Sequence, residues 1–480
     1  MMATSANGPR PGPRLGLLIT SIDVFNPEAK ERSEAGIRAY FDELVASGKV
    51  DAGSVVVGRI ERPHEAVAAA EEFAQACVDV VAIANVAFPN GQVFLALATN
   101  PHLSRLPLAV IADPEPKGDE WATNAWCGAI MNNFAAHRLG RPIAAIPGPS
   151  DARSFRDEFE RLLRVAATIK AMRHEFIGRY GDAPGGFHSA TGDQLAYAAK
   201  FGTRVDTVDL SAVRECFTTG KTSGYLADES FTDDDVRATM QSVREGREVS
   251  VDDQMLERGC RMYHALRCMA RANGHTSLAL RCWPEVNEPH IGVSLCLCIS
   301  LLLGNADVRA AACEADWPAA VVQLLGTLLT GQPAVCLDWV NYTGGSDIVQ
   351  LGHCGVGLMG HMAAGCQCEV VTAHPVLRQG GRHMGPVHIG QYEYGPKTGI
   401  CMMQDVDRRF RMLAFTGESG PETDRGMKYV AADVRFPKYR ELHRLILEGG
   451  FPHHLAVAFG DIREDLRLLC KFLEVEYVEP

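Results

Sequence analysis

The strongest constraint on the fold is a regular alternation, beginning at Leu15, between short apolar runs and stretches with helical periodicity. The apolar runs are LGLLITS, VVVGRI, VDVVAIANVAF and PLAVIAD. The helical stretches between them are expected near residues 28–48, 63–78 and 91–99. Strands that alternate with helices at this spacing predict a parallel, Rossmann-like sheet.

The remainder of the chain divides into two further regions. In the hinge-like segment PGPSDARSF, Ser150 or Asp151 is expected to cap a helix that runs to about Arg173. A second α/β pattern follows, with a strand expected near residues 277–286 and helices near 193–201, 233–246, 251–272, 291–304 and 315–330. Beyond Gly331, short β runs punctuated by Gly and Pro predict a mainly antiparallel, barrel-like β domain that closes with a helix near 462–473. We therefore expect a disordered tail and three domains, at residues 1–14, 15–150, 151–330 and 331–480.

Composition excludes several classes of function. The net charge of −12 comes from 59 acidic and 47 basic residues without a basic patch, so nucleic acid is not an expected partner. No apolar run is long enough to cross a membrane, and the N-terminal segment lacks the apolar core of a signal peptide, so a cytoplasmic location is expected. Fifteen cysteines without a CxxC pair indicate reduced thiols. No GxGxxG follows the first strand, so no nucleotide cofactor is expected.

Several potential metal ligands lie at the edges of the predicted elements in the last third of the chain. Glu314 precedes a helix, Asp338 and His353 end strands, and His454 lies with His453 in a Pro-flanked turn. Carboxylates and imidazoles, with no thiolate pair at metal spacing, favour Mn²⁺, with Mg²⁺ or Co²⁺ as alternatives. Each residue also has an ordinary explanation, as a first-turn acid, a strand-terminal acceptor, a core histidine or part of a surface turn.

Two segments resemble a known enzyme family. CEADWPAAVVQLLGTLLTGQPAVCLDW looks like the segment of L-fucose isomerases that supplies two metal-binding carboxylates, here Glu314 and Asp338. GGFPHHLAVAFGD is similar to the last segment of L-arabinose isomerases, which implies His454 as a ligand, and QLGHCG places His353 where that branch has another. The chain is shorter than L-fucose isomerase proper, and its carboxylate segment is unlike the arabinose one, so it looks like a divergent member.

This resemblance implies a metal-dependent aldose–ketose isomerase that works through a cis-enediol, with Glu314 and Asp338 as metal ligands and proton shuttles. The resemblance also implies a homo-oligomer of three to six subunits. Candidate substrate contacts are Glu285, Trp283, Trp339, His453, Arg378 and Arg382. The last two lie in a basic stretch that suits a phosphate, sulfonate or carboxylate group on the sugar, although such a stretch is also typical of a solvated loop or a subunit contact.

Two other functional classes remain open from the sequence. The same ligand set suits another metal-dependent enzyme, such as an epimerase or hydrolase. Two Rossmann-like units in tandem also resemble periplasmic sugar-binding proteins, which bind without turnover. The missing signal peptide and a third domain that carries the ligand candidates favour the isomerase.

Overall fold

The computed structural model describes residues 12–480 apart from residues 116, 225, 284–290, 342–344, 360, 363–369, 375–377, 380–381 and 424–428. The chain forms two compact units, each described here by itself. One unit ends at Ala171 and also includes Glu464–Glu474, close to the end of the chain. The other comprises Met172–Arg463 and Val475–Pro480. The three-domain division expected from the sequence stays a prediction.

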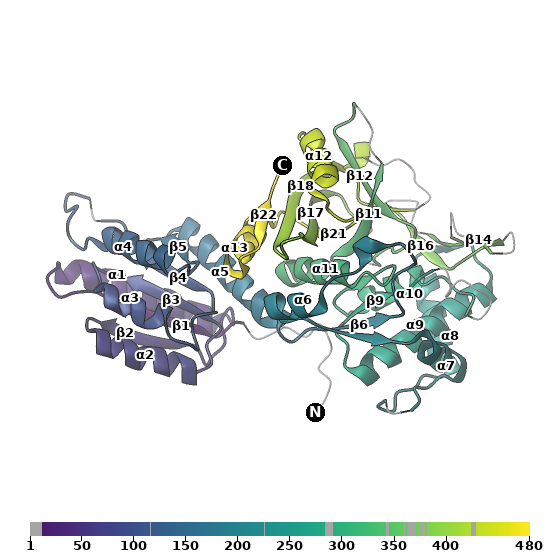
Figure 1. Cartoon of the computed structure of the whole chain (residues 1–480), viewed down its shortest axis with the longest axis horizontal. Coiled ribbons are helices and arrows are strands. Elements are labelled where there is room, and N and C mark those ends of the chain that lie inside the picture. Colours follow the sequence, from purple (N-terminus) through teal and green to yellow (C-terminus); the bar gives the residue numbers. More distant parts are fainter. Residues whose placement is uncertain are drawn as a thin grey trace. The chain divides into compact units, whose positions relative to one another are not determined.

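The N-terminal unit is built on a five-stranded parallel sheet in the order β2-β1-β3-β4-β5 (Figure 1). Its strands are β1 (Leu15–Thr20), β2 (Val55–Ile60), β3 (Val80–Asn85), β4 (Leu108–Ala112) and β5 (Ala144–Pro147). Its helices are α1 (Pro27–Ala46), α2 (Pro63–Gln75), α3 (Gly91–Ala98), α4 (Ala125–Arg138), α5 (Arg153–Met172) and, from near the chain terminus, most of α13 (Arg463–Leu473).

The central strands β1, β3 and β4 are buried on both faces because helices cover both faces of the sheet. Leu15, Leu17 and Ile19 of β1 face a core shared with α1 and α5, whereas Leu18 faces a core shared with α2 and α3. This alternation explains why the strand sequences are continuously apolar instead of alternating with polar residues. The predicted parallel sheet is confirmed.

The second unit begins with a four-stranded parallel sheet in the order β10-β9-β6-β7. Its strands are β6 (Phe176–Tyr180), β7 (Arg204–Val208), β9 (Ser277–Leu280) and β10 (Ala311–Ala312). The helices of this part of the chain are α6 (Gln194–Phe201), α7 (Leu210–Thr219), α8 (Asp233–Arg244), α9 (Asp253–Asn273), α10 (Cys296–Gly304) and α11 (Trp317–Thr330). A second parallel α/β sheet was expected here and is confirmed.

The C-terminal part of this unit is an antiparallel β-barrel of six strands. Its strands run in the order β11-β21-β17-β18-β20-β12, and β12 pairs back with β11 to close the ring. They are β11 (Val335–Asn341), β12 (Ile348–His353), β17 (Gly395–Gln404), β18 (Phe410–Ser419), β20 (Val434–Arg435) and β21 (His454–Phe459). Strand β19 (Val430–Ala431) pairs with β12, strand β22 (Glu476–Val478) pairs with β18, and α12 (Tyr439–Gly449) precedes β21. Closure removes unpaired strand edges, and the predicted barrel-like domain is confirmed.

Short strands lie beside this barrel. A three-stranded sheet contains β8 (Glu248–Val249), β13 (Val370–Thr372) and β16 (Val387–Ile389), and a two-stranded ribbon contains β14 (Arg378–Gln379) and β15 (Arg382–His383). The apolar helix α11 contacts both β9 and β10 of the parallel sheet and β17 and β21 of the barrel. It therefore fixes the segment just before it, around Glu314, against the barrel.

Two expected element boundaries differ from the structure. The helix expected at 291–304 begins at Cys296, because Gly292 has a φ of +62°, outside the right-handed helical region. The strand expected at 277–286 ends at Leu280. Among the helices that the structure describes, none is long and apolar enough to cross a bilayer.

Candidate active site

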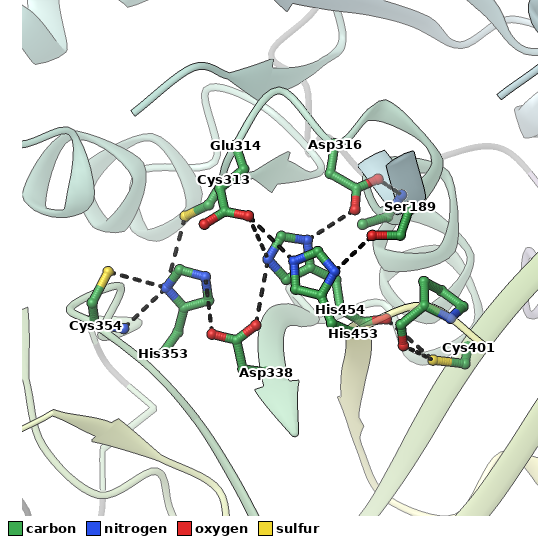
Figure 2. Close-up of polar contacts among 12 residues, drawn as sticks. Ser189, Cys313, Glu314, Asp316, Asp338, His353, Cys354, Cys401, His453 and His454 are labelled. Atoms are coloured by element: carbon green, nitrogen blue, oxygen red, sulfur yellow. Dashed lines mark hydrogen bonds and ion pairs between the residues drawn. The ribbon is translucent and has the colours of Figure 1, made fainter. Parts of the chain in front are cut away.

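Glu314 lies in a tight turn between β10 and α11. Both Glu314 and Ala315 adopt left-handed backbone conformations, with φ of +58° and +53°. Consecutive non-glycine residues in this region are unfavourable, and such strain persists only where the surroundings hold it. This strained segment connects the end of β10 directly to α11. It also directs the Glu314 carboxylate toward the barrel residues drawn in Figure 2.

Barrel register brings the second carboxylate to the same place. Asp338 of β11 is directly opposite His454 of β21 in an antiparallel pair and opposite Gly352 of β12 on its other side. Directly opposed residues on antiparallel strands have neighbouring side chains on one face. Asp338 and His454, which are 116 residues apart, are therefore brought together by strand pairing.

His454 is the central residue of the cluster. Its Nδ1 lies 2.8 Å from Oδ2 of Asp316, and its Nε2 lies 3.6 Å from both Glu314 Oε2 and Asp338 Oδ1 (Figure 2). Burial disfavours the imidazolium, but the hydrogen bond that Nδ1–H donates to Asp316 and the charges of the surrounding carboxylates outweigh burial and raise the pKa of His454 to about 9. In the metal-free protein, this ring therefore carries a proton on Nε2 at neutral pH.

The Glu314 carboxylate has polar partners on both oxygens. Trp283 donates its indole N–H to Oε1 at 3.1 Å, and His453 Nε2 lies 3.3 Å from Oε2. Burial raises the pKa of Glu314, but the bond with His453, the charge of His454 and the bond from Trp283 together hold it below its usual value. Glu314 is therefore ionised at neutral pH, as a ligand or a base requires.

His353 approaches from β12. Its Nε2 lies 3.9 Å from Asp338 Oδ2, and its Nδ1 lies 3.0 Å from the backbone nitrogen and 3.2 Å from the sulfur of Cys354. To bind a metal through Nε2, the neutral His353 ring must carry its proton on Nδ1, from which it can donate to the Cys354 sulfur. The backbone N–H of Cys354 donates to a lone pair on Nδ1 and so favours the opposite tautomer. Of the two imidazoles, His454 is thus better prepared to bind a cation, because Asp316 holds its Nδ1 proton.

These donors fit a divalent cation. Two triads each place one ligand atom per residue within 4.8 Å of one another: Glu314, His453 and His454, and Asp338, His353 and His454. The Nε2 atoms of His353 and His454 are both buried and have no hydrogen-bond partner in the described part of the chain. Buried polar atoms are normally satisfied, so a cation between these nitrogens and the two carboxylates would complete the site. The donor set is hard to borderline, and the identity of the metal is not determined by it.

The other predicted site residues lie in different places. Trp283 and His453 are in the cluster, whereas Trp339 stacks on Phe415 at 5.6 Å between ring centroids. Glu285 lies outside the described residues. Arg378 and Arg382 occupy the paired strands β14 and β15, where the structure describes their backbone only. Among the other basic residues of that stretch, Lys397 is buried and donates to Ser419 Oγ at 2.6 Å.

Two residues at the site were not predicted to belong there. By its position Asp316 is a first-turn acid, and it caps α11 by accepting the backbone N–H of Ala319 at 2.8 Å. Its second oxygen accepts the Nδ1–H of His454. Ser189 Oγ lies 2.8 Å from His453 Nδ1. The E-x-D spacing of Glu314 and Asp316 was visible, but the partner of Asp316 is 138 residues away and no local pattern indicates it.

Comparison with known proteins supports a sugar isomerase. Residues 16–173 match the family described as fucose/sulfoquinovose isomerase, N-terminal domain. The sulfoquinovose isomerase of Alkalicoccus urumqiensis is 25% identical over 412 residues, covering 84% of this chain and 86% of the relative. Those of Clostridium sp. (strain MSTE9) and Priestia aryabhattai are each 22% identical, covering 83% of this chain and 86% and 85% of the relatives.

A likeness to solved structures adds no further argument. An ABC transporter solute-binding protein from Burkholderia multivorans aligns at 12% identity with a TM-score of 0.18, covering 67% of this chain and 95% of that one. This score is too low to support the sugar-binding alternative. The N-terminal match and the relatives that extend over most of the chain agree with the resemblance seen in its last third. Residues 16–173 thus match the N-terminal domain of fucose/sulfoquinovose isomerases, and most of the chain is similar to sugar isomerases, which are intramolecular oxidoreductases.

Proposed function

We propose that this protein is a metal-dependent aldose–ketose isomerase for an anionic sugar, with Glu314, Asp338, His353 and His454 as the metal ligands. The observation that carries the proposal is the convergence of two carboxylates on two buried imidazole nitrogens that lack hydrogen-bond partners among the described residues. A divalent ion bound there supplies Lewis-acid polarisation of the sugar carbonyl. Mn²⁺ suits the donor set best, with Mg²⁺ and Co²⁺ as alternatives.

The residues of the chain then move the protons. Isomerisation through a cis-enediol transfers one proton between C1 and C2 and another between their oxygens. Glu314 and Asp338 each place an oxygen 3.6 Å from His454 Nε2, and these two carboxylates are our candidates for the proton transfers. Asp338 is the more accessible, since its side chain is 41% exposed against 14% for Glu314. Trp283 and His453 hold Glu314 in place, and Asp316 holds His454.

The anionic substrate is supported by the relatives and by the sequence. The relatives reported above are named for sulfoquinovose, an aldose that carries a sulfonate group. Arg378 and Arg382 are our candidates for contacts with that group, because a guanidinium matches an oxyanion in charge and geometry. A homo-oligomer of three to six subunits is part of this proposal.

The test begins with chelator-stripped protein to which Mn²⁺ is restored. We expect turnover of sulfoquinovose to its ketose to exceed that of glucose and L-fucose, and Glu314→Gln and Asp338→Asn to abolish it. Asp405→Asn is the matched control, because Asp405 is a carboxylate in the β17–β18 turn that pairs with Arg409. Arg378→Ala and Arg382→Ala should raise KM for the sulfonated sugar and leave that for neutral sugars unchanged.

Different failures have different meanings. Faster turnover of a neutral aldose would retain the isomerase and remove the anionic substrate. Stoichiometric Mn²⁺ binding with no ketose from any aldose would refute the proposed reaction while keeping the metal site. Full activity after chelation would refute the metal requirement.

A further inference from the structure

A second group of ligands lies beside the proposed active site and contacts it where the Cys354 sulfur lies 3.2 Å from His353 Nδ1. Cys296, Cys354 and His374 each place one ligand atom within 4.8 Å of the others. The two sulfurs are 3.7 Å apart, and Cys296 also forms a side-chain hydrogen bond with His374. Three elements distant in sequence supply these residues: the first turn of α10, the end of β12 and the segment after β13.

We propose that Cys296, Cys354 and His374 form a second metal site, specific for a thiophilic ion, for which Zn²⁺ is the fitting case. Two sulfurs at about 2.3 Å from a tetrahedral zinc ion lie about 3.75 Å apart, from the zinc–sulfur distance and the tetrahedral angle. The observed separation of the two sulfurs, 3.7 Å, matches this spacing. An imidazole completes a Cys₂His set, which leaves a fourth tetrahedral position for water or another small ligand.

The surroundings favour a thiolate at Cys296, and Cys354 is the more exposed of the two cysteines. Cys296 is the first residue of α10, where the helix dipole stabilises a thiolate. Cys296 and His374 are 2% and 1% exposed, whereas Cys354 is only partly buried. Soft sulfur ligands discriminate against Mn²⁺, so the two proposed sites select different ions. This proposal does not depend on the isomerase reaction.

Cobalt is the probe that separates this site from the carboxylate site. Thiolate-to-cobalt charge-transfer absorption arises only where cysteine binds the ion, and the proposed active-site ligands include no sulfur. We expect reduced, full-length protein titrated with Co²⁺ to develop this absorption to one equivalent, and Zn²⁺ to displace it. Cys296→Ser and Cys354→Ser should remove or halve it, and His374→Asn should weaken binding at least tenfold.

Cys298→Ser is the matched control, because Cys298 is also a buried thiol of α10 and bonds instead to the carbonyl of Gly259 at 3.3 Å. It should keep the absorption. Glu314→Gln should also keep it, even though it loses Mn²⁺ and turnover under the proposed function, so failure of one proposal is distinguishable from failure of the other.

X-ray absorption on wild-type protein loaded with zinc in the presence of excess Mn²⁺ covers the case in which the cysteine variants do not fold. Two sulfur neighbours at about 2.3 Å support the site. No sulfur neighbours, or a cobalt spectrum without thiolate absorption in fully reduced wild-type protein, overturns it. A Cys296–Cys354 disulfide in the isolated protein, with no zinc uptake after reduction, would also overturn it in favour of a redox pair.

Discussion

Replacing Asp316 with asparagine tests how the buried carboxylate prepares His454 for a metal. One oxygen of Asp316 caps α11 at Ala319 and the other accepts the Nδ1 proton of His454 at 2.8 Å. Asparagine caps a helix as well as aspartate does, so the fold should be retained. With its oxygen on the cap, the amide N–H₂ would face Nδ1 and force the neutral ring to carry its proton on Nε2, where the ion needs a lone pair.

Two opposing effects set the magnitude. Loss of a residue that orients a ligand costs about 10–100-fold in metal affinity. Against this, the wild-type ring has a pKa of about 9, so below that pH the ion must displace a proton. Lowering the pH from 9 to 7 therefore weakens the metal affinity of the wild-type protein by about 100-fold, or ~2.7 kcal/mol. The variant loses less affinity over this range, because its ring binds the proton less tightly. The metal affinity of the variant should therefore differ least from that of the wild type at pH 7 and most above pH 9.

The measurement is anaerobic Mn²⁺ titration at pH 7, 8 and 9 by calorimetry, with Asp405→Asn as control. The wild-type Kd should fall about tenfold per pH unit. Asp316→Asn should show a shallower slope and bind about 10–100-fold more weakly at pH 9. Equal slopes and equal affinities in the two proteins would refute the role assigned to Asp316.

Three further predictions concern the rest of the molecule. Burial lowers the pKa of Lys397 to about 8 from 10.5, so the unfolded chain holds a proton that the folded chain lacks between these values. That difference adds stability as the pH rises through this window, by ~3 kcal/mol in total, and the contribution is absent below about pH 8. In urea unfolding from pH 7 to 11, the free energy of unfolding of the wild type should rise by this amount relative to that of Lys397→Met. An equal pH dependence in the two proteins would contradict the assignment. Trp126 and Phe134 of α4 are 53% and 68% exposed, so we expect them in a contact between copies of the chain. Light scattering should then show a lower mass for the double glutamate variant, and an unchanged mass would exclude this surface. A Cβ on Gly399 would lie 2.3 Å from a ring atom of Phe415, so Gly399→Ala should cost ~1–3 kcal/mol of stability through overpacking. An unchanged melting temperature would show that the ring can move.

Local sequence patterns accounted for most of the elements. Continuous apolar strands spaced by helical stretches predicted the first parallel sheet, because parallel strands are buried on both faces. A second α/β pattern after the hinge-like segment predicted the other. Gly- and Pro-punctuated β runs beyond Gly331 predicted the antiparallel barrel. Helices α4, α7 and α12 were not predicted individually, and the start of α10 was misplaced across Gly292. The ends of helices and strands are predicted less well than the elements themselves, because a periodic pattern shows where an element lies better than where it begins or ends.

The sequence by itself determined the fold class, because strand and helix patterns are local. It also offered Glu314, Asp338, His353 and His454 as candidate ligands, through their places at the ends of predicted elements and the resemblance of their segments to sugar isomerases. Only the tertiary structure decided which atoms meet. Barrel closure sets Asp338 opposite His454, and the strained turn before α11 brings Glu314 and Asp316 to the same imidazole. The Cys296–Cys354 pair, 58 residues apart, has no metal spacing in sequence at all. Side-chain convergence depends on strand register and helix packing, and these are fixed by contacts between residues far apart along the chain.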